Sequence, residues 1–525
     1  MILQRLKLAK YKMLKNIEIE FNKPISVFIG VNGSGKSSLL EALALIFSSA
    51  FEQILLKKDV IAPDEIIGCS VEYTLRFEEE TEKDVMMSKF NIEYIPVKIE
   101  INHKGKIEIK INSDNEEFLK ALSQDYIPEQ LLPKRIISYY SGISKSFEVI
   151  HNKIQGQYLK RLIQDPNETE SGYIKNIDLP IYVFDENDFD ILLSVLFSFR
   201  YRDTVKDLLV NKLKLEPKND FLQVIVNKKE FDNEEYSGRN KDVMTSSKTI
   251  KDDKKKLAFI YDELEKIKKE RIDNFFGATG RLKNFLSQLR RSSLIPEKVY
   301  SEKFEKYEFK FDLDNWQKLS DEILTGPKEL FELLYMLKHN GLLVSINVNL
   351  YKGNNEFSGQ QLSEGEKQVV IINALNEILG LNNTLFMFDE PDTYLHPSLQ
   401  DDLIINIQES NDYEYYQNHY FVTTHNPSLI NNLDDDYGEL FIMKQGKIID
   451  HHLKWFGRDS NDVLTEIMGT ESRPIWSRKL LNKIDYLLDK DVEEGAKLLE
   501  ESKSKFPNDS IDIIRLQSKL DFLRD

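Results

Sequence analysis

A chain of 525 residues, of which 41% are hydrophobic and 30% charged, is long enough for two to four domains with substantial cores. The net charge of −17 argues against a broad nucleic-acid-binding surface, because such surfaces usually carry net positive charge, so any nucleic-acid contact must be local or come from a partner chain. The single cysteine excludes a disulfide framework, and no apolar run suits a signal peptide or a membrane span, so we expect a cytoplasmic protein without membrane contact.

The N-terminal region predicts strands on both sides of one helix. Residues 1–29 alternate apolar and polar side chains and predict two or three strands, the last of which, "ISVFIG", is fully apolar and therefore buried. The loop "GVNGSGKSS" and the apolar helix "LLEALALIF" follow. Residues 69–112 alternate again and predict an antiparallel meander, with a hairpin turn at "HKG", residues 103–105.

The middle of the chain, from 145 to 335, is more charged and predicts mostly helices. Residues 188–213 form a strong helical candidate, whereas the polar residues 228–256 predict a mobile loop or linker. The apolar residues beyond it have helical spacing over about two heptads, which is too short for a long coiled-coil arm and indicates a compact insertion. They are Leu257, Ile260, Leu264 and Ile267.

The C-terminal part of the chain predicts strands again and then helices. The predicted strands are 341–353, 384–391 and 419–427, followed by a hairpin over 439–450. From Pro474 onward the spacing of apolar residues predicts helices to the end of the chain.

A phosphate-binding loop is predicted at "GVNGSGKS", residues 30–37, which fits G-x-x-x-x-G-K-[ST] between an apolar strand and a helix. Glycines let the backbone wrap around phosphates, and the N–H groups and dipole of the helix start attract the phosphate charge. We expect Lys36 to reach the β- and γ-phosphates and Ser37 to ligate Mg²⁺. The predicted nucleotide-binding residues of this loop are Asn32, Gly33, Ser34, Gly35, Lys36, Ser37 and Ser38.

Two further strand ends are predicted to complete the site. In "TLFMFDEP" a buried strand presents Asp389, which we expect to hold Mg²⁺, and Glu390, which we expect to activate the attacking water. A solvated turn is the alternative for this pair, but the apolar run before it and Pro391 after it disfavour that interpretation. His425 ends the strand in "FVTTHNP" and is either a γ-phosphate sensor, which we favour, or a structural polar residue.

A second helix start suited to phosphate is "LSEGEKQ", which begins at Leu362, more than three hundred residues after the first. Here Ser363 is also a predicted N-cap with Glu366 three residues on, an arrangement that caps a helix without any ligand. The two interpretations of Ser363 are compatible with each other.

These motifs, in this order, resemble the ATP-binding-cassette ATPases, specifically the soluble branch that contains RecF, Rad50, SMC and OLD-type proteins. "LSEGEKQ" is similar to the signature sequence of that family, and Ser363 and Gly365 match positions that contact the γ-phosphate bound by the opposite protomer. The resemblance implies ATP and Mg²⁺ as cofactors and a homodimer or higher homo-oligomer formed through the ATPase heads. It covers residues 1–145 and 336–455.

Two departures from the family pattern bear on the site. His396 stands where transporter-type members have the aspartate of the D-loop, and the form "DEPD…LHP" is similar to the OLD and RecF-like branch instead. The glutamine of the family's Q-loop has no counterpart in "IISYYSGISKS", residues 136–146, where that loop should fall.

The predicted fold class is α/β: an ATP-binding-cassette ATPase head, with a mixed sheet around the phosphate loop and an antiparallel β subdomain, a helical insertion and a helical C-terminal tail. The predicted domains are an N-terminal ATPase lobe at 1–145, the insertion with its charged linker at 146–335, a C-terminal ATPase lobe at 336–455 and the tail at 456–525.

The tail adds a weaker resemblance. The motifs "YYSG" and "WFGRDSNDVLTEIMGTESRP", followed by helices, are similar to the PtuA-type ATPases of Septu and retron anti-phage systems, whose partner is an HNH nuclease. The resemblance implies an ATPase that senses or gates an effector nuclease of HNH type in bacterial antiviral defence. The alternatives are a RecF-like DNA-repair ATPase that acts directly on DNA and an OLD-like stand-alone nuclease.

Two charged stretches bear on these alternatives. The acidic run at 434–436 predicts a loop in preference to a set of nuclease carboxylates. The basic stretch 281–293 predicts a solvated helix face, with contact to nucleic-acid phosphates as the alternative.

Overall fold

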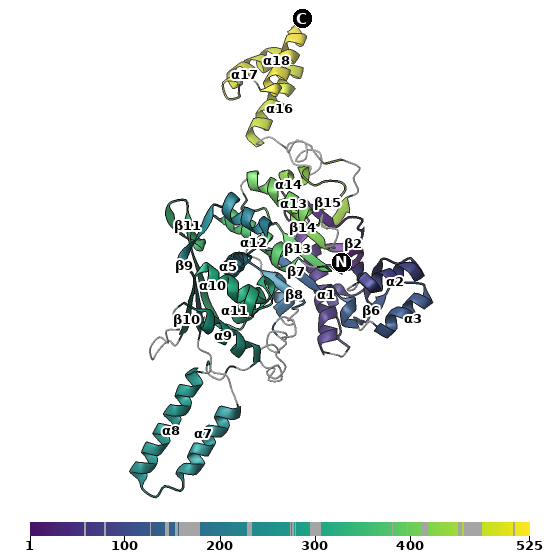
Figure 1. Ribbon diagram of the computed structural model, residues 1–525. Coiled ribbons are helices and arrows are strands. Elements are labelled where there is room, and N and C mark those ends of the chain that lie inside the picture. The colour runs from purple at the N-terminus through teal and green to yellow at the C-terminus, as the bar shows by residue number, and fades with distance from the viewer. Residues whose placement is uncertain are drawn as a thin grey trace. The chain divides into compact units, whose positions relative to one another are not determined.

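The computed structural model describes most of the chain (Figure 1). The described residues are 1–56, 59–77, 80–125, 128–141, 146–152, 156, 179–227, 234–273, 275, 278, 280–294, 306–380, 382–395, 397–411, 418–449, 454–455, 475–507 and 510–524. The chain divides into two compact units, Met1–Phe456 and Gly457–Asp525. Among the described residues, no helix combines the length and the apolar character that crossing a membrane requires.

A seven-stranded sheet carries the phosphate loop, and all its neighbouring strands are parallel except for the edge strand β16. The middle strands β3, β14 and β13 are wholly buried, as expected for parallel strands covered on both faces. Their carboxyl ends lie at one edge of the sheet, where the three predicted strand-end motifs therefore meet. In sheet order, the strands are β16 Lys447–Ile449, β15 Gly438–Lys444, β3 Ile25–Ile29, β14 His419–Thr424, β13 Thr384–Asp389, β7 Arg135–Tyr140 and β8 Ile181–Phe184.

The helix α1, Lys36–Leu56, begins within the phosphate loop and contacts two sheets. It packs against β13 and β14 of the central sheet and against β1 and β6 of a five-stranded antiparallel sheet. This arrangement confirms the strands predicted before residue 29 and the predicted meander, in which Gly105 at the hairpin turn has φ +73°. The sheet consists of β2 Leu14–Glu20, β1 Ile2–Tyr11, β4 Ser70–Arg76, β5 Tyr94–Ile101 and β6 Ile107–Ile111, with α2 Glu80–Phe90 and α3 Glu116–Asp125 in the connections around it.

A four-stranded antiparallel sheet includes two strands from the segment for which mostly helices were predicted. The segment β9 is a strand and not a helix, because it pairs with β11, far along the chain. Leu222, Val224 and Val226 of β9 are buried. Local sequence does not reveal a pairing partner so distant. In sheet order, the strands are β10 Lys306–Phe311, β9 Leu215–Asn227, β11 Leu343–Lys352 and β12 Asn355–Ser358.

The helix predicted over 188–213 is interrupted after Leu196. Trp316 Nε1 donates a hydrogen bond of 2.8 Å to the Ser194 carbonyl, and Gln317 Nε2 donates one of 3.1 Å to the Phe197 carbonyl. These side chains satisfy carbonyl groups at the helix end, so the helix stops there. The helices of this region are α5 Phe189–Leu196, α6 Asp203–Lys206, α9 Gly280–Ser292, α10 Leu313–Lys318 and α11 Pro327–His339, and short π-helical turns cover Asp207–Lys212 and Leu319–Ile323.

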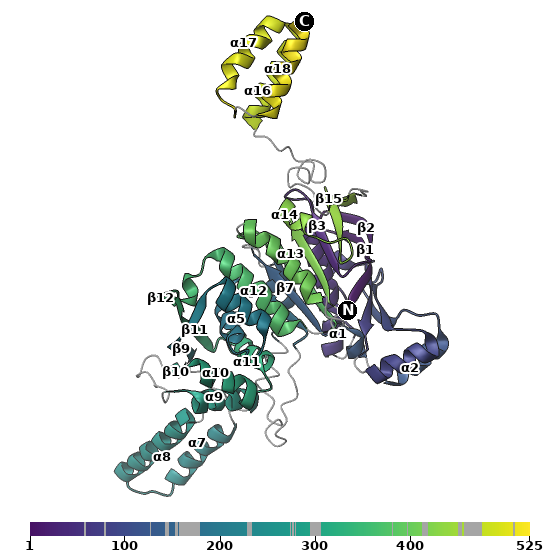
Figure 2. The same cartoon turned by 45° about the horizontal axis from the view of Figure 1, so that its top comes forward.

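The prediction of a mobile loop or linker over 228–256 was wrong, because Glu234–Ser247 form the helix α7. Residues 228–233 lie outside the described part of the chain. The helix α7 lies beside α8, Asp253–Asp273, in both views (Figure 1, Figure 2). Val243 of α7 packs against Ile267 of α8, with Phe259 and Leu264 beside them. A helix as polar as α7 is marginal alone, and this apolar contact stabilises it.

The helical end of the chain is confirmed. The helices α16 Ile475–Lys490, α17 Val492–Lys503 and α18 Ile511–Arg524 form the second unit around a core of their own. That core contains Leu481, Ile484, Leu488, Leu499, Ile513, Leu516 and Leu520. The first unit also contains α12 Glu364–Leu379, α13 Pro397–Asn411 and α14 Pro427–Asn431.

Some predicted features lie outside the described residues: His396, residues 142–145 of the expected Q-loop, and residues 456–474, which include most of the tail motif and the start of the predicted tail. The acidic run at 434–436 lies in a loop before β15, as predicted, and the stretch 281–293 lies almost wholly in the helix α9.

Candidate active site

The phosphate loop connects β3 to α1, and its backbone requires glycine. Gly35 has φ +107°, and a Cβ atom on it would lie 2.9 Å from Leu14 Cδ2, so a larger residue would strain the loop. The Ser34 carbonyl accepts a hydrogen bond of 2.8 Å from the N–H of Gly446, in the turn between β15 and β16, which braces the loop. One cavity of about 280 Å³ is lined by Met13, Asn32, Gly33, Ser34, Gly35, Lys36, Ser37, Ser38 and Glu390. All the residues predicted from the loop therefore share one cavity.

The side chain of Lys36 connects the loop to the second motif. It is only 4% exposed, its Nζ atom donates a hydrogen bond of 2.8 Å to the Gly30 carbonyl, and Nζ lies 3.9 Å from Glu390 Oε1. Burial lowers the pKa of the ammonium group, and the carboxylates of Glu390 and Asp389 oppose that shift. An ammonium group held by a carbonyl of its own loop can exchange this partner for a phosphate oxygen.

Asp389 lies at the end of β13, within reach of two hydroxyl groups. The Ser37 hydroxyl donates a hydrogen bond of 3.1 Å to Asp389 Oδ1, and the Thr423 hydroxyl donates another to the same atom. Burial raises the pKa of Asp389, while these hydrogen bonds favour its ionised form. A buried carboxylate beside a serine hydroxyl supplies two oxygen ligands of the kind that Mg²⁺ takes alongside phosphate oxygens.

Glu390 follows directly and is held in a left-handed conformation, with φ +52°. Its N–H lies 3.1 Å from both the carbonyl and the hydroxyl oxygen of Thr423, so β14 fixes this backbone. Glu390 Oε1 lies 3.4 Å from Nδ1 of His425, whose side chain is 48% exposed. The structure therefore brings together Lys36, Ser37, Asp389, Glu390 and His425, as the sequence predicted.

The two threonines before His425 were not predicted as site residues. Thr423 contacts Asp389 and Glu390, as described, while the hydroxyl of Thr424 donates a hydrogen bond of 2.9 Å to Asp392 Oδ2. Asp392 is 2% exposed, and burial raises its pKa. The signal was present in "FVTTHNP", because hydroxyl residues at the end of a buried strand need partners.

Ser141, which follows β7, occupies the region where a Q-loop was expected. Its hydroxyl donates a hydrogen bond of 2.5 Å to the Glu390 carbonyl and lies 3.2 Å from Thr393 Oγ1. Thr393 Oγ1 also donates to the Glu390 carbonyl, at 2.9 Å. A serine thus contacts the backbone of the candidate general base at the position where no glutamine was found.

Ser363 and Gly365 lie at the start of α12 and are not among the described residues that line the cavity at the phosphate loop. Ser363 caps the helix, since its Oγ accepts a hydrogen bond from the N–H of Glu366 and Glu366 Oε2 accepts one from the N–H of Ser363. The capping interpretation of Ser363 is therefore confirmed, and its exposed position is compatible with a second role. A Cβ atom on Gly365 would lie 2.9 Å from the Tyr394 carbonyl, so only glycine fits without displacement.

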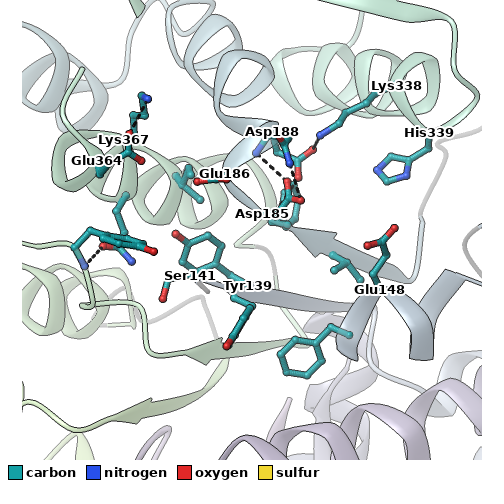
Figure 3. Close-up of a pocket in the computed structure, with 18 residues that line it drawn as sticks. Tyr139, Ser141, Glu148, Asp185, Glu186, Asp188, Lys338, His339, Glu364 and Lys367 are labelled. Carbon is teal, nitrogen blue, oxygen red and sulfur yellow. Dashed lines mark hydrogen bonds and ion pairs between the residues drawn. The ribbon is translucent and has the colours of Figure 1, made fainter. Parts of the chain in front are cut away.

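A larger cavity of about 630 Å³ lies beyond the ends of β7 and β8 (Figure 3). Two of its cationic side chains are paired, Lys338 with Asp188 at 2.6 Å and Lys367 with Glu364 at 3.1 Å. His339 lies on its wall, and its ring centroid is 4.1 Å from that of Tyr335. The cavity shares no described residue with the one at the phosphate loop, where Lys36 and Glu390 meet and which is the candidate active site.

Comparison with known proteins finds proteins of low sequence identity to this chain. The DNA replication and repair protein RecF of Psychromonas ingrahamii is 28% identical over 149 residues, which are 28% of this chain and 36% of that protein. This chain therefore spans about a third of the length of that relative. The SMC head domain with a coiled coil and joint derived from Pyrococcus yayanosii is 13% identical, covering 89% of this chain and 99% of that one, with a TM-score of 0.33.

The recombination mediator protein RecF bound to ATP is also 13% identical and covers 85% of this chain and 97% of that one, with a TM-score of 0.27. A family model described as "AAA ATPase domain" matches residues 1–430. Because this match covers most of the 525 residues, the chain belongs to the AAA ATPase domain family.

Proposed function

We propose that this chain is a Mg²⁺-dependent ATPase whose complete site is shared by two copies and whose cycle gates an effector nuclease in bacterial anti-phage defence. The observation that carries the ATPase proposal is the meeting of Lys36, the Ser37–Asp389 pair and the Glu390–His425 pair at one strand edge. Membership of the AAA ATPase domain family supports ATP as the nucleotide.

Each side chain has a role in the proposed reaction. Lys36 and the loop N–H groups bind the β- and γ-phosphates, and Ser37 and Asp389 would hold Mg²⁺, which neutralises charge on the phosphate oxygens. Glu390 orients the attacking water and accepts its proton. His425, 3.4 Å from Glu390, donates a hydrogen bond to a γ-phosphate oxygen.

The proposal of a shared site rests on the start of α12. Ser363 and Gly365 lie apart from the loop cavity of their own chain, and the exposed Ser363 is available to a second copy. We therefore assign Ser363 and Gly365 to the nucleotide bound by the partner subunit, in a homodimer or higher homo-oligomer joined through the ATPase units.

The gating proposal rests on the resemblance of the motifs to defence ATPases with an HNH nuclease partner. The similarity to RecF of Psychromonas ingrahamii favours a second candidate, an ATPase that acts directly on DNA. The two are distinguished by DNA stimulation of hydrolysis in the purified chain, which the second candidate requires and the first does not.

A mixing experiment tests the shared site. Lys36→Ala and Ser363→Arg proteins should each hydrolyse little ATP, whereas their mixture forms heterodimers with one doubly altered site and one unaltered site. We expect activity to recover to a substantial fraction of wild type. If hetero-assembly is demonstrated and activity does not recover, Ser363 acts within its own chain or not at all.

A further inference from the structure

Gln368 lies one helical turn after the start of α12 and contacts the loop that follows Glu390. It is 2% exposed, and its Oε1 atom accepts a hydrogen bond of 3.2 Å from the N–H of Tyr394. Its Nε2 atom is buried without a hydrogen-bond partner among the described residues. Tyr139, Gln368 and Tyr394 line the same cavity.

The loop that Gln368 contacts is short and tied to the candidate general base. The N–H of Thr393 donates a hydrogen bond of 3.3 Å to the Glu390 carbonyl, and the N–H of Leu395 donates one of 3.1 Å to the Asp392 carbonyl. The hydroxyl of Thr424 fixes Asp392 from β14, at 2.9 Å. Residues 390–395 thus form a hydrogen-bonded turn that continues directly from the end of β13.

Two contacts join this turn to the first turns of α12. One is the hydrogen bond from Tyr394 to Gln368, and the other is the close approach of the Tyr394 carbonyl to Gly365, where a Cβ atom would lie at 2.9 Å. Ser363 caps the same helix, two residues before Gly365. The turn after Glu390 therefore contacts the helix start that carries Ser363, which an ion pair of 2.6 Å between Lys352 and Glu366 also holds.

We propose that Gln368 is a positioning residue that holds Ser363 in the orientation in which one protomer presents it to the nucleotide of the partner subunit. This inference rests on the proposed shared site and deepens it. Because the turn that orients Gln368 begins at the general base of its own chain, each nucleotide site influences the signature helix that serves the other site. The two sites of a dimer are thereby linked through Tyr394 and Gln368.

The test uses heterodimers purified through two different affinity tags. In the reference heterodimer one chain carries Lys36→Ala, which inactivates the site at its own phosphate loop. The remaining functional, or live, site combines the phosphate loop of the unaltered chain with Ser363 of the altered chain. Gln368→Met, which keeps the side-chain length and removes the acceptor, is then added to either chain. On the chain that donates Ser363 it should lower hydrolysis about tenfold, the factor that corresponds to one lost hydrogen bond. On the chain with the live phosphate loop, hydrolysis should stay close to the reference.

Two readouts separate positioning from loss of structure. Affinity for a fluorescent ATP analogue should be unchanged in Gln368→Met, so the loss appears in kcat and not in nucleotide binding. Gln368→Glu, which keeps an acceptor for the Tyr394 N–H, should retain most of the activity. A loss that follows the chain with the live phosphate loop, or that is equal for both arrangements, overturns the proposal. Failure of the Lys36→Ala and Ser363→Arg mixture to recover activity would reject the shared site and this inference with it, whereas recovery there without a chain-dependent loss here would overturn this inference alone.

Discussion

The hydroxyl of Ser37 donates a hydrogen bond of 3.1 Å to the carboxylate of Asp389, although 352 positions separate the two residues in the chain. The same Asp389 oxygen accepts a hydrogen bond from Thr423, so hydroxyls from two elements orient one carboxylate. In the proposed Mg²⁺ site, groups that orient a ligand in this way contribute to metal affinity as well as to geometry. Ser37, Asp389 and Thr423 form the part of the candidate site in which the loss of a single hydroxyl group should most clearly change ATP hydrolysis.

Replacing Thr423 with Val should weaken activation by Mg²⁺, because Asp389 loses one hydroxyl donor and the N–H of Glu390 loses one acceptor. We expect the Mg²⁺ concentration for half-maximal ATP hydrolysis to rise about 10- to 100-fold, as for other residues that orient a metal ligand. Thr423→Ser keeps the hydroxyl and should behave like wild type. Equal effects of the two substitutions would show that packing, and not the hydroxyl, is what matters at this position.

Replacing Glu390 with Gln should preserve ATP binding and lower hydrolysis at least about a hundredfold, because the amide does not accept the proton of the attacking water. The bound nucleotide should then keep two copies together, which sedimentation velocity with Mg-ATP measures as a larger species. Glu108→Gln, on the exposed face of β6, is the matched control and should change neither quantity. A Glu390→Gln protein that hydrolyses ATP normally would remove Glu390 from the role of base.

Two buried neutral histidines should lower the free energy of unfolding as the pH drops below neutrality, a contribution that the buried carboxylates with raised pKa, Asp188, Asp389 and Asp392, oppose. Burial lowers the pKa of His151 and of His419 from 6.5 to about 3. Between these values the unfolded chain binds protons that the folded chain does not, so stability is present above pH 6.5 and is lost as the pH falls toward 3. At pH 5 each histidine should cost about 2 kcal/mol, which urea unfolding at pH 7 and pH 5 measures.

The pH effect can be assigned with His419→Asn and His103→Gln. Nδ1 of His419 accepts a hydrogen bond of 3.1 Å from the N–H of Leu3, a bond that protonation would remove. His419→Asn should therefore unfold more easily at pH 7 but lose less stability between pH 7 and pH 5 than wild type. His103 is exposed, so its replacement should leave the pH dependence as it was. An unchanged pH dependence in His419→Asn would exclude this residue as its source.

Deleting residues 475–525 should leave ATP hydrolysis close to the full-length rate, because the tail forms a compact unit with its own core. In the proposed defence role, the same deletion should abolish co-purification of an effector that docks on the tail. The purified full chain, assayed with plasmid, single-stranded DNA and tRNA in the presence of Mg²⁺ or Mn²⁺, should not cut nucleic acid. Cleavage that a point mutation in this chain abolishes would favour a stand-alone nuclease over the gating proposal.

The sequence predicted the central strands and most of the candidate site because their signals are local. The loop at Lys36 lies between an apolar strand and an apolar helix, and Asp389 ends another apolar strand. The residues next to each motif are therefore enough to predict the structure around it. The strand β9 and the helix α7 were missed because distant partners, β11 and α8, stabilise them. For Thr423 the local sequence signalled a hydroxyl group in need of a partner, but not that the partners are Asp389 and Glu390 at the end of the neighbouring strand.

The strand order has a consequence for how the protein is made. β3 ends by residue 29, yet both of its neighbours in the sheet, β14 and β15, come from His419–Thr424 and Gly438–Lys444. The ribosome must therefore synthesise roughly four hundred further residues before the apolar β3 can pair with either neighbour, which takes about 20 to 80 s at ordinary elongation rates. During that interval a hydrophobic strand with two open edges is exposed to other nascent chains. Prematurely terminated products that lack β14 should aggregate, and expression of the full chain should improve with slower initiation or with chaperones that shield nascent N-terminal segments.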